Sequence, residues 1–153
     1  MVASKQHKAN KKPKTRETVY SSKTVKSEPL PDLLRLYPSW QISLLQMVHP
    51  WGWHDIEKTK TEEIKTKLAE FEKKTWNTIL VDERHRNHRI PKNKLSDGAQ
   101  QRLAEVGQDD VDYLVSLRLS GKERVFGILN MGVLRLLWWD PDHQICPSPK
   151  KHT

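Results

Sequence analysis

The sequence predicts an α+β fold in which N-terminal helices pack on a C-terminal antiparallel β-meander. From residue 59 onward, apolar residues recur at the three- and four-residue spacing of an amphipathic helix. From residue 113 the apolar period falls to two, and short glycine-containing turns separate three apolar runs. The 153 residues have room for one domain with an ordinary core once a polar N-terminal segment is set aside.

Residues 1–29 differ from the rest of the chain in composition. Eight Lys or Arg against two Glu give this segment +6 of the total net charge of +8. It has almost no large apolar residues to offset its ordering entropy, so we expect a disordered basic tail. Two roles fit such a tail: a solubilising arm, or an arm that binds RNA or DNA with salt-dependent affinity. The remaining residues, 30–153, are nearly balanced in charge and are expected to form a single α+β domain.

Residues 30–58 form a lead-in rich in proline and tryptophan. Prolines from Pro29 to Pro50 divide it into short pieces. We expect short helices over residues 33–37 and 40–48, whose apolar side chains cover a core built by later elements. Trp51 and Trp53 are expected to pack in that core.

Residues 59–107 are expected to hold two helices. The buried face of the first helix is predicted by residues at helical spacing: Ile64, Leu68, Phe71, Thr75 and Ile79. Thr59 and Glu62 match a capping box at its start. The second helix should run from Leu95 or Ser96 to about Val106 and stop at Gly107.

Residues 113–145 are expected to form the sheet. Apolar runs at 114–119, 124–129 and 133–139 predict three strands, and the connections at 120–122 and 130–132 are short enough only for antiparallel neighbours. A three-residue loop at 130–132 would place Arg124 opposite Trp138. Both faces are then largely apolar, which predicts helices on one side and partial cover on the other.

Charged residues inside these strands are candidates for a site. They are Arg118, Arg124 and Arg135. They are either solvated or paired with nearby carboxylates (Glu123, Asp140 or Asp142), or two or three of them converge on a shallow groove and clamp a phosphate. Arg118 and Arg124 would share a face if the turn pairs Leu119 with Glu123.

His143 follows Asp-Pro-Asp where the last strand should end. It is either a general acid or base at neutral pH or a surface residue of the turn. The charged segment 82–94 (DERHRNHRIPKNK) is expected to be an exposed connection outside the core. Its cations are candidates for contact with nucleic-acid phosphates, or they are only solvated: Arg84, Arg86, Arg89, Lys92 and Lys94.

Two close pairs, His85 with His88 and His143 with Cys146, have ligand types and spacings that zinc tolerates. Neither pair lies on a recognised metal-binding turn, so we favour chance placement and expect no metal and no nucleophilic role for Cys146. A phosphate-binding glycine loop and a nucleophile elbow are also missing from the sequence, and we expect no cofactor.

The element order, the segments RVFGI and VLRLLWWD, and His143 together resemble the RelE/HigB superfamily of small bacterial toxins. The resemblance implies a sheet that offers a concave basic surface to messenger RNA, often on the ribosome, and a protein antitoxin as partner. It also implies metal-independent cleavage by the ribose 2′-hydroxyl. Arg118, Arg124 and Arg135 would stabilise the transition-state charge, and His143 would act as acid or base.

A non-catalytic binding module is the competing interpretation. There the sheet face with Trp138 and Trp139 would bind a protein or stack on single-stranded nucleic acid. A metal-dependent hydrolase built on the His and Cys pairs is a third class. The single cysteine, the lack of a secretory apolar segment and the shortness of every apolar run lead us to expect a cytoplasmic protein without a membrane partner.

Overall fold

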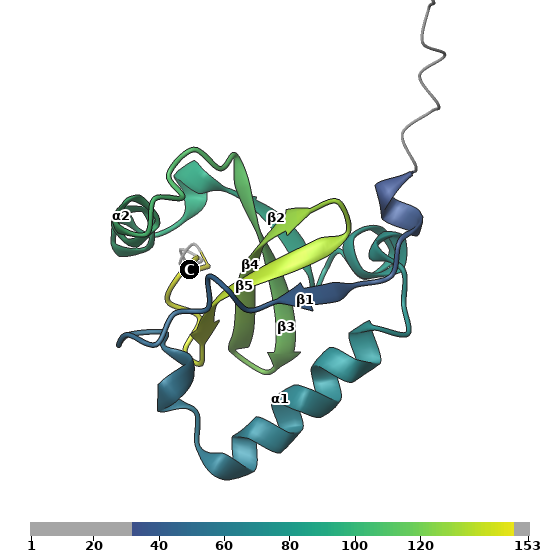
Figure 1. The fold of residues 1–153 in the computed structure, drawn as a ribbon, viewed down its shortest axis with the longest axis horizontal. Coiled ribbons are helices and arrows are strands. Elements are labelled where there is room, and N and C mark those ends of the chain that lie inside the picture. Colours follow the sequence, from purple (N-terminus) through teal and green to yellow (C-terminus); the bar gives the residue numbers. More distant parts are fainter. Residues whose placement is uncertain (1–31, 149–153) are drawn as a thin grey trace, which may run out of the picture.

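The computed structural model describes residues 32–148, so the predicted basic tail over 1–29 lies outside the described residues. The fold is α+β and has a five-stranded mixed sheet in the order β1-β5-β4-β3-β2 (Figure 1). The strands are β1 (Ser39–Gln41), β2 (His88–Pro91), β3 (Tyr113–Ser120), β4 (Glu123–Asn130) and β5 (Val133–Asp140). The helices are α1 (Lys58–Phe71), α2 (Asp97–Glu105), a π-helical turn at Thr78–Asp82 and short 3₁₀ helices at Leu33–Arg35, Trp53–Asp55 and Lys92–Lys94.

The three predicted C-terminal strands are present and antiparallel, but the expected register between the last two is wrong. Arg124 lies opposite Asp140, not opposite Trp138. The connection is a two-residue turn of Met131 and Gly132, whose φ angles of 52° and 83° are the left-handed values that tight hairpins need. A three-residue loop had been expected because Asn130 looks like a turn residue, whereas it ends β4.

The sheet is more than a meander, because both of its edge strands lie in segments where no strand was predicted. β1 pairs in parallel with β5 and overlaps the start of the stretch expected to be a helix over 40–48. β2 pairs antiparallel with β3 inside the charged segment 82–94. Edge strands have one unpaired side and tolerate charged side chains, which is why composition indicated a loop there. Ile90 is nevertheless buried in the core.

Both main helices were predicted, with differences at the ends of the first. α1 begins at Lys58 with Glu57 as its N-cap and no side-chain cap bond, so the Thr59–Glu62 capping box is wrong. It ends at Phe71, and Ile79 belongs to the separate π-helical turn. α2 starts as expected: the Ser96 hydroxyl accepts a hydrogen bond of 3.3 Å from the Ala99 N–H.

Each face of the sheet is buried in its own apolar cluster. On one side, Ile64 and Phe71 of α1 pack in a cluster with Val115 and Leu117 of β3. Figure 1 shows α2 on the other side of the sheet from α1. The cluster on that side contains Ala99, Leu103, Leu114, Phe126 and Trp138. The lead-in contributes to both clusters, as predicted, through Trp51 on the α2 side and Trp53 on the α1 side.

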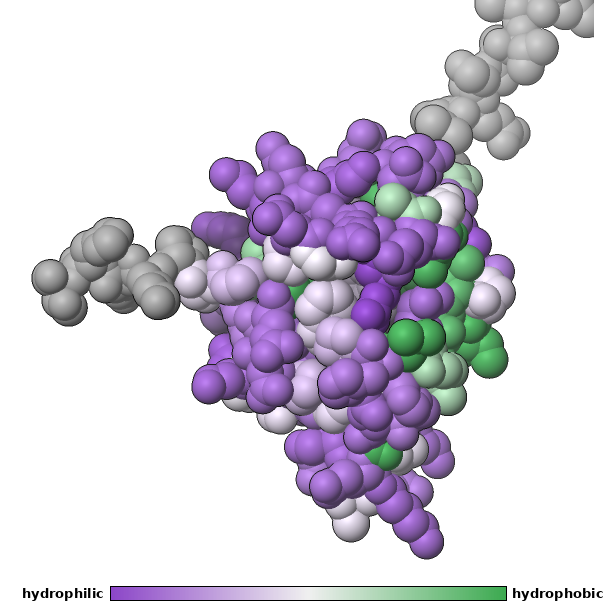
Figure 2. All heavy atoms as spheres, turned by 90° about the vertical axis from the view of Figure 1, so that its left-hand side faces the viewer, coloured by the Kyte–Doolittle hydropathy of each residue, from purple (hydrophilic) through white to green (hydrophobic). Residues whose placement is uncertain are grey.

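Outside these clusters the surface is mostly polar. Figure 2 shows hydrophilic side chains over most of one face, with apolar side chains gathered towards one edge of the view. The most exposed large apolar side chain is that of Ile42, and Met47 and Val48 of the same loop are also exposed. None of the helices within residues 32–148 is long and apolar enough to span a bilayer.

Gly127 of β4 lies where the sheet has no space for a side chain. A Cβ atom there would lie 2.7 Å from the carbonyl oxygen of Arg135 and 2.8 Å from Cγ of Leu134. We predict that Gly127→Ala lowers the free energy of unfolding by about 1–3 kcal/mol through overpacking. The matched change Gly98→Ala, in the first turn of α2, meets its nearest neighbour at 3.8 Å and should leave stability equal or slightly higher. Urea unfolding of both variants checks this, and equal stability of the two would contradict it.

Candidate functional site

One row of charged residues crosses the sheet at the end of the β3–β4 hairpin. Arg118 lies opposite Arg124, and Arg124 lies opposite Asp140. Cross-strand partners project from the same face, so all three lie on the α2 side. The predicted pairing of Leu119 with Glu123 is wrong, because a bulge at Leu119 shifts the register there. The structure still brings Arg118 and Arg124 together.

The two arginines carry positive charge that nearby carboxylates do not pair. Within residues 32–148, neither Arg118 nor Arg124 has a carboxylate oxygen within the 4.0 Å of an ion pair. Arg124 instead donates from Nη1 to the carbonyl oxygens of Gly121 at 2.7 Å and Glu123 at 3.1 Å. Its partial burial and then the charge of Arg118 lower the pKa of Arg124, while Asp140 acts in the opposite direction.

Asp140 is fully buried and shapes the loop that follows β5. Its carboxylate accepts hydrogen bonds from the backbone N–H groups of Asp142 at 3.3 Å, Gln144 at 3.1 Å and Ile145 at 2.8 Å. The carboxylate is therefore satisfied by the backbone and not by Arg124. These bonds close the loop and hold His143 with a φ of 59°, a left-handed value that histidine adopts more readily than most residues.

His143 and Arg124 line the same hollow, which has a volume of about 370 Å³. Its other lining residues are Gly121, Lys122, Asp142, Pro147 and Ser148. Lys122 lies in the exposed hairpin turn and was not among the predicted site residues, because a lysine in a turn is usually only solvated. The hollow thus joins two permanent cations and an imidazole to one carboxylate, that of Asp142, and its cations and imidazole suit a phosphate and a proton transfer beside it.

Arg135 lies apart from this group. It pairs with Ile128 of β4 and Gln41 of β1. It precedes Asp140 by five residues on β5, which corresponds to roughly 16 Å along a strand. Of the two or three arginines expected to converge, Arg135 is therefore not brought to the other two, and its Nε is buried without a hydrogen-bond partner among the described residues.

The cations of the predicted basic loop are distributed over a turn, β2 and the short helix after it. Arg84 and Arg86 are exposed in the turn before β2, and Lys94 is exposed after it. Arg89 pairs with Val115 on the α1 side and lies 5.5 Å from the centre of the Tyr113 ring. Lys92 donates from Nζ to the carbonyl oxygen of Asp109. His88 pairs with Ser116 and projects on the α2 side of the sheet.

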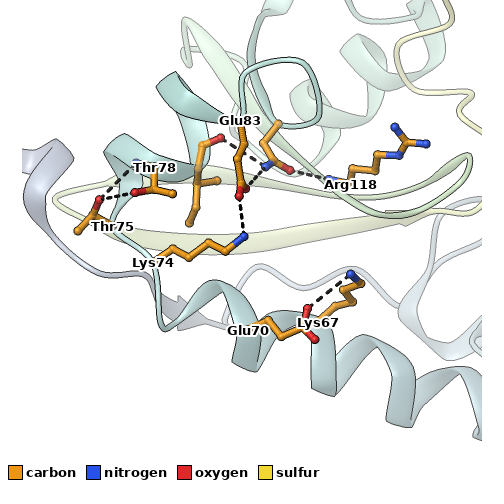
Figure 3. Close-up of polar contacts among 9 residues, drawn as sticks. Lys67, Glu70, Lys74, Thr75, Thr78, Glu83 and Arg118 are labelled. Atoms are coloured by element: carbon orange, nitrogen blue, oxygen red, sulfur yellow. Dashed lines mark hydrogen bonds and ion pairs between the residues drawn. The ribbon is translucent and has the colours of Figure 1, made fainter.

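A buried asparagine holds the segment before β2 against β3. Asn87 is 1% exposed, donates to the carbonyl oxygen of Ile79 at 3.3 Å and accepts from the backbone N–H of Arg118 at 3.0 Å. Lys74 and Glu83 form an ion pair of 2.7 Å beside it. Figure 3 shows the Arg118 side chain extending away from this polar network. Asn87 therefore fixes the backbone of Arg118, whose guanidinium has no hydrogen-bond or ion-pair partner within residues 32–148.

The tryptophans at the end of β5 are core residues. Trp138 is 0% exposed and Trp139 is 9% exposed. The Trp139 indole N–H donates to the buried carboxylate of Glu123 at 3.0 Å. The predicted stacking on a ligand from the sheet face is therefore wrong for Trp138, which is fully buried, while Trp139 keeps only a small accessible surface.

The histidine and cysteine pairs are not joined in space into a metal site. Over the described part of the chain, no three His, Cys, Asp or Glu side chains are grouped closely enough to hold a metal ion. The Cys146 thiol contacts the carbonyl oxygen of Lys94 at 3.4 Å, and burial raises the pKa of the Cys146 thiol. A raised pKa reduces the thiolate fraction at neutral pH.

Comparison of the chain with protein-family models, with curated proteins and with solved structures found no match.

The loop around His143 should depend on the Asp140 carboxylate. We predict that Asp140→Ala lowers the free energy of unfolding by about 2 kcal/mol or more, because three backbone donors lose their acceptor and one of these bonds is buried. The exposed Asp110→Ala should change it by less than about 0.5 kcal/mol. Denaturant unfolding measures both. Faster hydrogen exchange at the Ile145 amide in Asp140→Ala would locate the effect, and unchanged stability would contradict it.

Proposed function

We propose that this protein binds RNA through a cationic strip formed by Arg118, Lys122 and Arg124. The observation that carries the proposal is the side-by-side placement of Arg118 and Arg124 without a carboxylate at ion-pair distance among residues 32–148. Like charges directly opposite on a sheet are destabilising, and a phosphate backbone bound there would offset that repulsion. Arg124 is partly desolvated in the free protein, so less hydration is lost when it binds an anion.

RNA is preferred over DNA because His143 lies beside the strip, where a ribose 2′-hydroxyl would give it a proton to exchange. The basic composition of residues 1–29 would add sequence-independent affinity. The resemblance to the RelE/HigB toxins adds two proposals. The protein binds its RNA on the ribosome, and an antitoxin protein covers the strip. With a single cysteine, the reducing cytoplasm is the compartment we propose.

The binding proposal is tested with the double variant Arg118→Gln, Arg124→Gln in the full chain. Its affinity for a single-stranded RNA should fall about tenfold or more, and the slope of log K against log salt should decrease by about 1.4. The matched control, Lys58→Gln with Lys65→Gln, removes two exposed charges from α1 and should keep both affinity and slope. Fluorescence anisotropy over a salt series measures these values. Equal losses in the two double variants would show only a general charge effect and refute the strip.

RNA cleavage is a second candidate function, favoured by the shared hollow of His143, Arg124 and Lys122. In that reaction the 2′-oxygen attacks the adjacent phosphorus and the bond from phosphorus to the 5′-oxygen breaks. His143 would accept the 2′-hydroxyl proton, and the leaving 5′-oxygen would take a proton from water. The products are a 2′,3′-cyclic phosphate and a free 5′-hydroxyl. Arg124 and Lys122 would stabilise the charge that develops on the phosphoryl oxygens.

His143→Asn tests cleavage, because asparagine also tolerates the left-handed backbone at this position but has no titrating group. We predict that the wild type produces new RNA 5′ ends and that the variant, with an unchanged circular dichroism spectrum and melting temperature, produces them at least about a hundredfold more slowly. Mapping of 5′ ends on purified RNA measures this, with a 2′-deoxy substitution at the cleaved nucleotide as the substrate control. Absence of new ends with wild type would leave a non-catalytic RNA-binding module.

A further inference from the structure

A second hollow lies directly beside the first and shares Asp142 with it. Its volume is about 380 Å³, within the range of pockets that hold small molecules. Its apolar lining residues are Pro50, Trp51, Trp139 and Pro141, and the two tryptophans are each only 9% exposed. The polar side chains that line it are His49, Asp55, Asp142 and Gln144.

Some polar side chains of this hollow already have a polar partner in the protein, and others have none among residues 32–148. Asp55 is occupied, since its carboxylate lies 2.8 Å from Nδ1 of His49 and 3.3 Å from Nε2 of His54. Asp142 and Gln144 use their backbone N–H groups to bind Asp140 at 3.3 and 3.1 Å. Within residues 32–148 their side chains form no hydrogen bond, although the loop that carries them is fixed. The lining of the hollow therefore includes two exposed residues, Asp142 and Gln144, whose side chains form no hydrogen bond among the described residues.

We infer that this hollow holds a guanine base of the RNA whose phosphate lies at the cationic strip, an inference that rests on the proposed function. A carboxylate only accepts hydrogen bonds. Guanine is the one common RNA base whose Watson–Crick edge presents two adjacent donors, N1–H and the N2 amino group, and Asp142 would accept both. Adenine, cytosine and uracil place acceptors beside a single donor and would set a lone pair against the carboxylate.

The second free group fits the same base. The Gln144 carboxamide can donate to O6, which is the remaining acceptor on that edge of guanine. The exposed ring of His49 gives the base a flat surface to stack on, as in recognition of unpaired RNA bases, and Pro50 and Pro141 offer apolar contacts. Asp142 and His143 are consecutive, so a base bound by Asp142 places its own nucleotide next to the hollow of His143.

The experiment measures binding of the full chain to labelled uridine hexamers that carry G, A, C, U or inosine at one central position. The wild type should bind the G hexamer about tenfold more tightly than the A, C and U hexamers, with inosine, which lacks the N2 amino group, in between. In Asp142→Asn the G-to-A affinity ratio should fall to about one. Asp110→Asn removes the same charge at an exposed position before β3 and should keep the ratio.

The other results separate this inference from the proposal beneath it. Equal affinity of the wild type for all five hexamers would overturn guanine recognition, while salt-dependent binding that needs Arg118 and Arg124 would leave the proposed function standing. Absence of binding to every hexamer at low salt would overturn both. A final measurement titrates the protein with guanosine monophosphate alone. The mononucleotide should bind far more weakly than the G hexamer, and equal affinity would mark a mononucleotide site and overturn the RNA assignment.

Discussion

The need to bury both faces of the sheet is the constraint on which the rest of this structure depends. β3, β4 and β5 carry apolar side chains on both sides, so one layer of helices cannot cover them. α1 covers one face, while α2 and Trp51 cover the other. The lead-in is therefore part of the core, although it contains little regular structure.

The same constraint places the candidate site. Inner positions on the α2 side are filled by Leu114, Phe126 and Trp138, and the row of Arg118, Arg124 and Asp140 lies at the end of the strands beyond this cover. In that row the Asp140 carboxylate accepts its hydrogen bonds from the backbone of its own loop. Arg118 and Arg124 therefore have no acidic partner at ion-pair distance in the described structure. The positive charge of these arginines thus stays unpaired in the described structure because Asp140, the last residue of β5, binds the loop that follows it.

The two hollows of the site differ in the chemical groups that line them. One joins Arg124 and Lys122 to the imidazole of His143, and the other has apolar lining residues with the side chains of Asp142 and Gln144. Since Asp142 belongs to both, the loop held by Asp140 would position phosphate and base contacts together. That coupling would make the site rigid before ligand binds, which lowers the entropy cost of recognition.

The sequence by itself determined the three C-terminal strands, the two main helices and the candidates Arg118, Arg124 and His143, because hydrophobic period, caps and turns are local signals. Only the tertiary structure decided the edge strands, since β1 and β2 are short and depend on their partners β5 and β3. It also decided the register, where a two-residue turn and bulges moved Asp140 opposite Arg124 and left Arg135 apart. Burial of Trp138 and the free side chain of Asp142 were likewise set by packing between segments distant in the chain, which no local pattern records.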